Sequence, residues 1–164
     1  MGTLLDAERC IVYVHSDNLL VTKAIRGANV RKFSLSTDRG IVGLVYTSRK
    51  GFIVSSPYSD RRFDQLLDQE RKSITNNMLC VPIKLGETCY GCLEIANKSH
   101  STFTKEDLHL ATSVAKELVL GLINKNKDNF PISEFNTKQM SINILTPLIK
   151  NVMIILVKTL KAKE

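Results

Sequence analysis

Tryptophan is absent from this chain of 164 residues, and aromatic residues make up only 6% of it. Proteins that bind single-stranded nucleic acid stack bases on aromatic side chains, so this composition argues against that class of function. The net charge of +7 does not change the conclusion, because basic charge alone supports only non-specific attraction. We therefore expect a solvated basic surface and no specific nucleic-acid partner.

The N-terminus also lacks the charged and then apolar segment of a secretory signal, so we expect a reducing, cytoplasmic location. Only four cysteines are present, at positions 10, 80, 89 and 92. Cys89 and Cys92 have the C-x-x-C spacing, which can indicate zinc or redox chemistry. No second such pair follows, and positions 89 and 92 of an extended strand point to opposite faces. The sequence therefore predicts free thiols, with no metal site.

Strand and helix patterns are mixed along a chain that is 43% hydrophobic and long enough for one domain. Strands are predicted over 10–14, 19–25, 30–35 and 52–55. A short helix is predicted over 41–48, and we expect it to end at a glycine cap near Gly51. A second short helix is predicted after a cap at Asp60, with the side chains of Phe63, Leu66 and Leu67 pointing to the interior. Strand pairs close in sequence favour an α+β domain, a mainly antiparallel sheet with helices packed on its faces.

The stretch from 76 to 110 predicts two strands, a loop over 84–88 and a capped helix. Alternation along the second strand puts Cys89, Gly91, Leu93 and Ile95 on one face, and Tyr90, Cys92, Glu94 and Ala96 on the other. Thr104 and Asp107 have the spacing of a capping box. The stripe of Leu108, Ala111, Ala115, Leu118 and Leu122 then indicates a helix packed on the sheet.

That stretch ends in Asn97-Lys98, four residues, Phe103, three residues and Asp107, an order that resembles the signature of GAF domains. These are sensor modules of cyclic-nucleotide phosphodiesterases, adenylyl cyclases and bacterial signalling proteins. Further segments resemble the family in order from residue 5 to residue 126: Leu5 to Cys10, Gly40-Ile41-Val42-Gly43, Pro57 to Phe63 and Asn77 to Ile83. The resemblance implies a six-stranded antiparallel sheet with helices behind it and a ligand pocket in front.

Carried over from the family, the ligand-binding candidates are Ile41, Val42, Asp68, Thr75 and Glu94. Backbone N–H groups at the start of the helix at Ile41 could meet a phosphate. Thr75 could donate a hydrogen bond, and Glu94 could accept one from a sugar hydroxyl or a base amine. No catalytic residue, metal or resident cofactor is predicted, and a cyclic nucleotide is the ligand that the resemblance suggests.

Two positions depart from the cyclic-nucleotide pattern. Cys10-Ile11 stands where binders tend to have Cys-Ser, and Ile25-Arg26 stands where they tend to have an aromatic residue and Asp. In the binders, the side chains at both positions would contact the purine edge of the bound nucleotide. A pocket that lacks such a hydrogen-bond partner can discriminate strongly against that ligand. A second interpretation of Glu94 is an exposed or ion-paired carboxylate without ligand. The family resemblance further implies that Lys98 and Asp107 form an internal salt bridge.

The predicted organisation is a GAF domain over 1–126, a polar linker over 127–139 and an apolar helix over 140–164. Residues 1–5 are too short for the helix that usually opens the family's fold. We expect the 140–164 helix to pack in its place or to pair with a second copy in a homodimer. A membrane span is not expected, because Lys150 interrupts the apolar run.

Three functions follow as hypotheses. The first is a regulatory small-molecule sensor of a signalling protein, such as a phosphodiesterase or a cyclase. The second is a ligand-free GAF module that serves dimerisation or acts as a spacer. The third is an enzyme that reduces free methionine sulfoxide through cysteines, which would need thiols on pocket loops, whereas the sequence places these in strands.

Overall fold

The computed structural model describes residues 7–27 and 31–124, and it confirms the predicted fold class. Six antiparallel strands form one sheet in the order β3-β2-β1-β6-β5-β4. The strands are β1 (Ala7–Ser16), β2 (Leu19–Arg26), β3 (Ser34–Ser36), β4 (Phe52–Val54), β5 (Met78–Leu85) and β6 (Thr88–Lys98). β1, β6 and β5 lie at the centre of the sheet, and both of their faces are covered, which accounts for the apolar middle of each strand.

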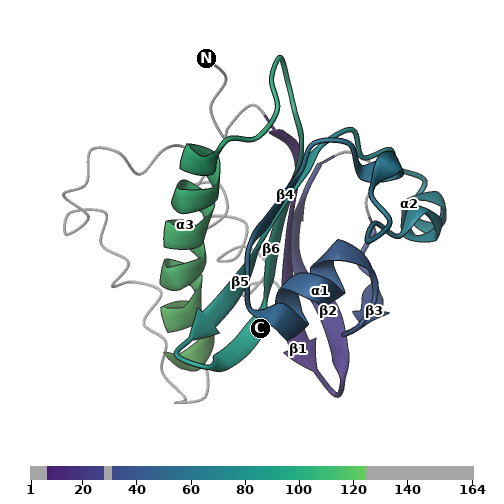
Figure 1. The fold of residues 1–164 in the computed structure, drawn as a ribbon. Coiled ribbons are helices and arrows are strands. Elements are labelled where there is room, and N and C mark those ends of the chain that lie inside the picture. The colour runs from purple at the N-terminus through teal and green to yellow at the C-terminus, as the bar shows by residue number, and fades with distance from the viewer. Residues whose placement is uncertain (1–6, 28–30, 125–164) are drawn as a thin grey trace.

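Helices cover both faces of the sheet (Figure 1). The long helix α3 (Lys105–Asn124) lies along one face, and α1 (Gly40–Ser48) and α2 (Gln65–Arg71) lie on the other, with a 3-10 turn η2 (Pro57–Ser59) between them in sequence. Within the part of the chain that the structure describes, no helix is long and apolar enough to cross a membrane.

The face beneath α3 holds an almost wholly apolar core. Leu93 and Ile95 of β6 point to this face, and both are fully buried. The predicted stripe on α3 is confirmed at Ala111, Ala115 and Leu118, which pack into the same cluster. Leu122 lies beyond the side chains that the structure describes.

The start of α3 and the end of β6 are joined as the sequence predicts. The Thr104 backbone N–H donates to the Asp107 carboxylate at 2.8 Å, and the Asp107 N–H donates to the Thr104 hydroxyl at 3.3 Å, which forms the capping box. Lys98 Nζ lies 2.6 Å from the same carboxylate, and both side chains are buried. The internal salt bridge between Lys98 and Asp107 is therefore present.

Several local predictions were wrong. The third strand covers only Ser34–Ser36, and α1 ends at Arg49, which itself adopts the left-handed conformation (φ 58°), so no glycine cap is used. The cap of α2 is Asp64, whose carboxylate accepts the backbone N–H groups of Leu66 and Leu67. The cap therefore lies four residues later than predicted, and in this helix Leu66 is 62% exposed, whereas Leu67 is buried.

The hairpin between β5 and β6 also differs from the prediction. Leu85 pairs with Thr88, so the turn has two residues, Gly86 and Glu87. A β-bulge follows: Ile83 pairs with Gly91 but Lys84 pairs with Cys89, which leaves Tyr90 as the additional residue on β6.

The bulge changes the face to which Cys89 points. Paired residues of an antiparallel sheet share a face, as do alternate residues of one strand, so Cys89 lies with Lys84, and Cys92 with Pro82, on one face. That face is the one covered by α1 and α2. The prediction that positions 89 and 92 point to opposite faces was wrong.

The predicted linker over 127–139 and helix over 140–164 lie outside the described residues.

Candidate functional site

A small cavity lies between the sheet, α1 and α2, and all five predicted ligand-binding residues line it. Its volume is about 20 Å³, enough for one water molecule, whereas ligand pockets are about 300–1,000 Å³. The lining residues are Arg9, Gly40, Ile41, Val42, Phe63, Asp64, Leu67, Asp68, Arg71, Thr75, Met78 and Glu94.

Glu94 lies at the centre of a buried ion-pair cluster at this cavity. Its Oε1 is 3.2 Å from Arg9 Nη2 and 3.5 Å from Arg71 Nη1, and its Oε2 accepts a 2.7 Å hydrogen bond from the Tyr13 hydroxyl. None of the three charged side chains is more than 5% exposed. Glu94 is thus ion-paired, as the second interpretation predicts, but it is buried rather than exposed.

The strand pattern explains how these groups meet. Arg9, Ile11 and Tyr13 alternate along β1 and pair with Ala96, Glu94 and Cys92 of β6, so all of them point to the α1/α2 face. Arg71, the last residue of α2, reaches the carboxylate from above the sheet and also donates to the Tyr13 hydroxyl at 3.0 Å.

Electrostatics holds Glu94 in its charged form. Burial by itself raises the pKa of this carboxyl group, but Arg71, Arg9 and the Tyr13 hydroxyl outweigh it and lower the pKa below the usual 4.5. For Tyr13, burial and the neighbouring Glu94 raise the pKa well above 10, so the phenol stays protonated and donates.

Thr75 and Asp68 extend the cluster towards α2. The Thr75 hydroxyl accepts a 2.6 Å hydrogen bond from Arg9 Nη2 and donates to Asp68 Oδ1 at 3.0 Å. The Tyr58 hydroxyl donates to the other oxygen of Asp68 at 3.0 Å. We call Arg9, Tyr13, Asp68, Arg71, Thr75 and Glu94 the charged cluster. The predicted polar ligand contacts are therefore occupied by the protein's own side chains.

Ile41 and Val42 lie in the first turn of α1, at the rim of the cavity. No side chain among the described residues caps this helix, so its first amide groups are available to an anion. The backbone N–H of Gly43 makes the first helical bond, to the Arg39 carbonyl at 2.9 Å.

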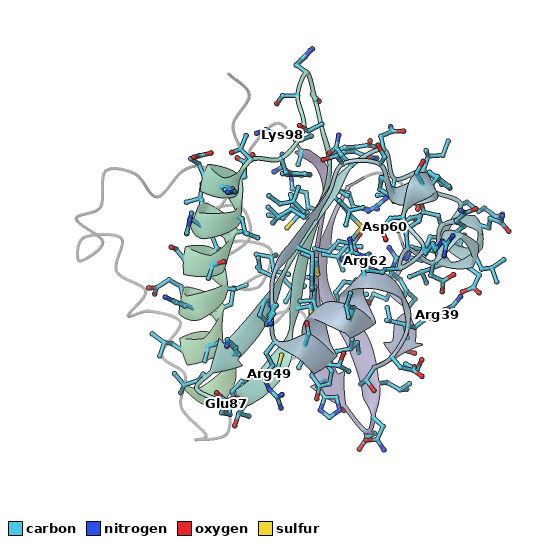
Figure 2. All side chains as sticks on the ribbon, in the orientation of Figure 1. Arg39, Arg49, Asp60, Arg62, Glu87 and Lys98 are labelled. Carbon is cyan, nitrogen blue, oxygen red and sulfur yellow. The ribbon has the colours of Figure 1, made fainter. Side chains whose placement is uncertain are left out.

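Arg39, which precedes α1, ties the two short helices together. Its guanidinium pairs with Asp64, the cap of α2, and Nη2 lies 2.9 Å from Glu70 Oε1. Figure 2 shows Arg39 on the side of α1 that faces α2. Both ion pairs are partly exposed and lie beside the cavity. We call the contacts of Arg39 with Asp64 and Glu70 the latch.

The comparison with protein families supports the resemblance found in the sequence: the model of the family described as "GAF domain" matches residues 1–122. This chain belongs to the GAF domain family. A relative, a probable 3′,5′-cyclic phosphodiesterase of Caenorhabditis elegans, is 30% identical over 77 residues, which is 47% of this chain and 11% of that protein. The chain spans about a tenth of that relative's length.

Solved GAF structures share the fold at low identity. The GAF domain of a phosphoenolpyruvate-protein phosphotransferase from Coxiella burnetii has a TM-score of 0.67 at 18% identity, covering 74% of this chain and 75% of the other. The type II free methionine-R-sulfoxide reductase of Thermoplasma acidophilum has a TM-score of 0.63 at 16% identity, covering 74% and 82%. Because sensors and enzymes both occur with this fold, function must be argued from the site.

Three members of the cluster in this GAF domain were missed in the sequence: Arg9, Tyr13 and Arg71. A signal existed for Arg9, because a charged residue in an otherwise buried strand requires a partner. Arg71 is the last residue of a short helix, and the sequence holds no signal for where its side chain points. Within the described residues, Arg71 Nε and Arg26 Nη1 are buried and have no hydrogen-bond partner.

Of the two positions that depart from the cyclic-nucleotide pattern, Ile11 lies at this site and Arg26 does not. Ile11 is fully buried and pairs with Glu94, whereas Arg26 pairs with Cys10, which belongs to the core on the α3 face. Ile11 presents no hydrogen-bonding side-chain group next to Glu94, so this edge of the site is apolar.

Proposed function

We propose that this GAF domain is a regulatory module that senses a small molecule in a signalling protein, such as a cyclic-nucleotide phosphodiesterase or cyclase. The charged cluster carries this proposal. Burying Arg9, Arg71, Asp68 and Glu94 costs several kcal/mol per ion before pairing, and well-packed apolar side chains would serve stability at least as well. Charged groups gathered at a cavity are typical of a functional site.

The groups at the cavity match a ligand that has an anionic part and a hydrogen-bond-donating part. The α1 amides and the two arginines suit a phosphate, and Glu94 or Asp68 suits an amine or a hydroxyl group. A cyclic nucleotide carries both parts. Its entry would exchange internal ion pairs for pairs to the ligand, and it would require α2 to move away from the sheet, because the present cavity accepts about one water molecule.

A thermal-shift screen with cyclic AMP, cyclic GMP and a panel of anionic metabolites tests this function. A ligand at about 100 times its Kd stabilises the folded state by about 2.7 kcal/mol, so the melting temperature rises with concentration. The Glu94→Gln variant should lose the shift, whereas Lys98→Ala, which breaks a buried pair on the other face, should keep it. A shift of the same size in both variants would contradict binding at this cavity.

A ligand-free regulatory module is the second candidate function, and the small cavity favours it. In that case the cluster is a structural feature, and the domain serves dimerisation or spacing. No compound of the panel would then change the melting temperature. Sedimentation analysis of the full chain would show a dimer whose dissociation constant is unaffected by substitutions in the charged cluster.

A further inference from the structure

Three thiols lie on the same face of the sheet as the charged cluster, and the β-bulge at Tyr90 brings two of them together. Cys92 interacts through side-chain hydrogen bonds with both Cys80 and Cys89. Among the described residues, no group of three His, Cys, Asp or Glu side chains could hold a metal ion.

The two members of the C-x-x-C pair differ in access to solvent. Cys92 is fully buried beneath α1, and its thiol donates to the Val42 carbonyl at 3.5 Å. Cys89 is half-buried at the end of β6, beside the turn, and its thiol donates to the Gly91 carbonyl at 3.3 Å. A small oxidant can therefore reach Cys89 from solvent, whereas Cys92 has no exposed surface.

The two thiols also differ in acidity. The interaction with the neighbouring Cys92 thiol lowers the pKa of Cys89 to about 7, with help from Arg49 and Lys84 and against the effect of burial. Burial raises the pKa of Cys92 well above 9. Cys89 is thus a nucleophilic thiolate near neutral pH, next to a protonated thiol.

Arg49 is held in place by the turn. Its Nε donates to the Glu87 carbonyl at 2.6 Å, and Figure 2 shows the two side chains next to each other at this end of the domain. Tyr46 of α1 is a further titratable neighbour of Cys89, and it stacks on His15 at a centroid distance of 5.0 Å.

We propose that Cys89 and Cys92 form a thiol oxidation site for hydroperoxides, in which Cys89 is the attacking thiol and Cys92 is the resolving thiol. The Cys89 thiolate attacks the terminal oxygen, the O–O bond breaks, and the leaving alkoxide or hydroxide takes a proton to give an alcohol or water. Cys92 then attacks the sulfenic sulfur of Cys89, and the hydroxyl group leaves with the Cys92 proton as water. The hydroperoxide is reduced by two electrons, and the two thiols are oxidised to one disulfide.

The disulfide would alter the first turn of α1, which lines the cavity. A bond between the two sulfurs removes the Cys92 hydrogen bond to Val42, and Val42 belongs to the first turn of α1, which lines the cavity. Oxidation should therefore change the position of this turn. The oxidation site itself does not depend on the proposed ligand, so the two proposals can fail separately.

The test is titration of the full-length chain with hydrogen peroxide, followed by thiol counting and peptide mapping without reductant. We expect a disulfide that joins Cys89 to Cys92, with the loss of two thiols and two hydrogens, and its reversal by dithiothreitol. A disulfide that joins Cys80 to Cys92, or that joins two chains, would overturn the proposal.

Three variants separate the roles. Cys89→Ser should slow thiol loss at least about tenfold, since only the buried thiols of Cys10, Cys80 and Cys92 remain. Cys92→Ser should leave a sulfenic acid at Cys89 that dimedone traps, with no disulfide. Cys10→Ser is the matched control, because burial raises the pKa of Cys10 to about 12, and this variant should oxidise like the wild type.

A pH profile tests the contact between the two thiols. The rate of Cys89 alkylation by iodoacetamide should have its midpoint near pH 7 in the wild type, and the midpoint should move upwards in Cys92→Ala. The melting temperature of each variant shows whether it is folded. Equal oxidation rates in folded Cys89→Ser and wild type, or an unchanged midpoint in folded Cys92→Ala, would refute the proposal.

Discussion

The two faces of the same sheet both bury apolar side chains, but they differ in the charged groups that they bury. Beneath α3, strand and helix side chains form an apolar cluster, and its buried ion pair, Lys98 with Asp107, lies at the point where β6 leads to α3. Beneath α1 and α2, an apolar cluster that includes Ile11 and Met78 surrounds Glu94, Arg9 and Tyr13 at the centre of the sheet. The comparison teaches that buried charges on the α3 face are confined to its edge, whereas the α1/α2 face carries the cost of burying them at its centre.

The largest expected effect comes from breaking the charged cluster. Glu94→Gln leaves two buried guanidinium groups without a charged partner, so we expect the free energy of unfolding to fall by about 3–5 kcal/mol, measured by urea denaturation. Replacing Arg9 and Arg71 by Met together with Glu94→Leu is the control, and it should recover most of that loss. If the triple variant were as unstable as the single one, the contrast between the two faces would be wrong.

Lys98→Ala should have the next largest effect. It leaves the Asp107 carboxylate with the Thr104 N–H but without its cation, so we expect a loss of about 3 kcal/mol, near the lower limit for a broken buried pair. Calorimetry would measure the loss in stability, and ligand binding should be retained. Selective loss of ligand binding at an unchanged melting temperature would contradict the structural role of this pair.

Thr75→Val should have an intermediate effect on the charged cluster. The substitution keeps the shape of the side chain but removes the hydroxyl group between Arg9 and Asp68, so we expect a loss of about 1–3 kcal/mol in urea denaturation. Thr75→Ser keeps the hydroxyl group and should lose much less. Equal losses in the two variants would mean that the methyl group, and not the hydrogen bonds, determines the stability.

Acidification should weaken the charged cluster on the α1/α2 face, by a fraction of the effect of Glu94→Gln. The folded pKa of Glu94 lies below 4.5, so its contribution is fully present above about pH 4.5 and is lost as the pH falls through the folded value. Denaturation at several pH values should show a smaller acid dependence in Glu94→Gln than in the wild type. The same acid dependence in both proteins would contradict an ionised Glu94 in the cluster.

Arg39→Ala should have the smallest effect on stability and a specific effect on binding. Partly exposed ion pairs contribute about 0.2–1 kcal/mol, so the fold should be nearly unchanged. Loss of the latch should make it easier for α2 to move, and any ligand of the panel should associate faster in stopped-flow measurements. Arg62→Ala, which removes another surface pair, with Asp60, is the control and should leave association unchanged.

Most of the fold was predictable because, in the central strands and the long helix, the pattern of apolar and polar residues agrees with the structure that each segment adopts. Alternation along β6 gave the correct faces from Gly91 onwards, and the capping box at Thr104 gave the start of α3. The short elements were less predictable, since a helix of seven residues carries little periodicity. The start of α2 was therefore placed too early, and Leu66 was assigned to the interior.

The sequence indicated some residues of the site but not their partners. Glu94 and Thr75, which the family resemblance gave as ligand-binding candidates, line the cavity, and their role in ligand binding stays a prediction. Glu94 is contacted by Arg9, Tyr13 and Arg71, which are between 23 and 85 residues away from it in sequence, so only the folded chain brings them together. The bulge was missed because strand periodicity assumes one residue per step, and Gly91 was the single hint of an irregularity.

The two residues inside the C-x-x-C motif, Tyr90 and Gly91, determine whether the two cysteines lie close together. Tyr90 is the additional residue that turns Cys89 towards Cys92, and a Cβ atom at Gly91 would lie only 1.9 Å from the Tyr13 carbonyl oxygen of β1. A homologous chain could therefore keep both cysteines and still lose their proximity through a deletion or a larger side chain between them. In comparisons among relatives, the pattern to follow is Cys, one residue, Gly and Cys, read as a single unit.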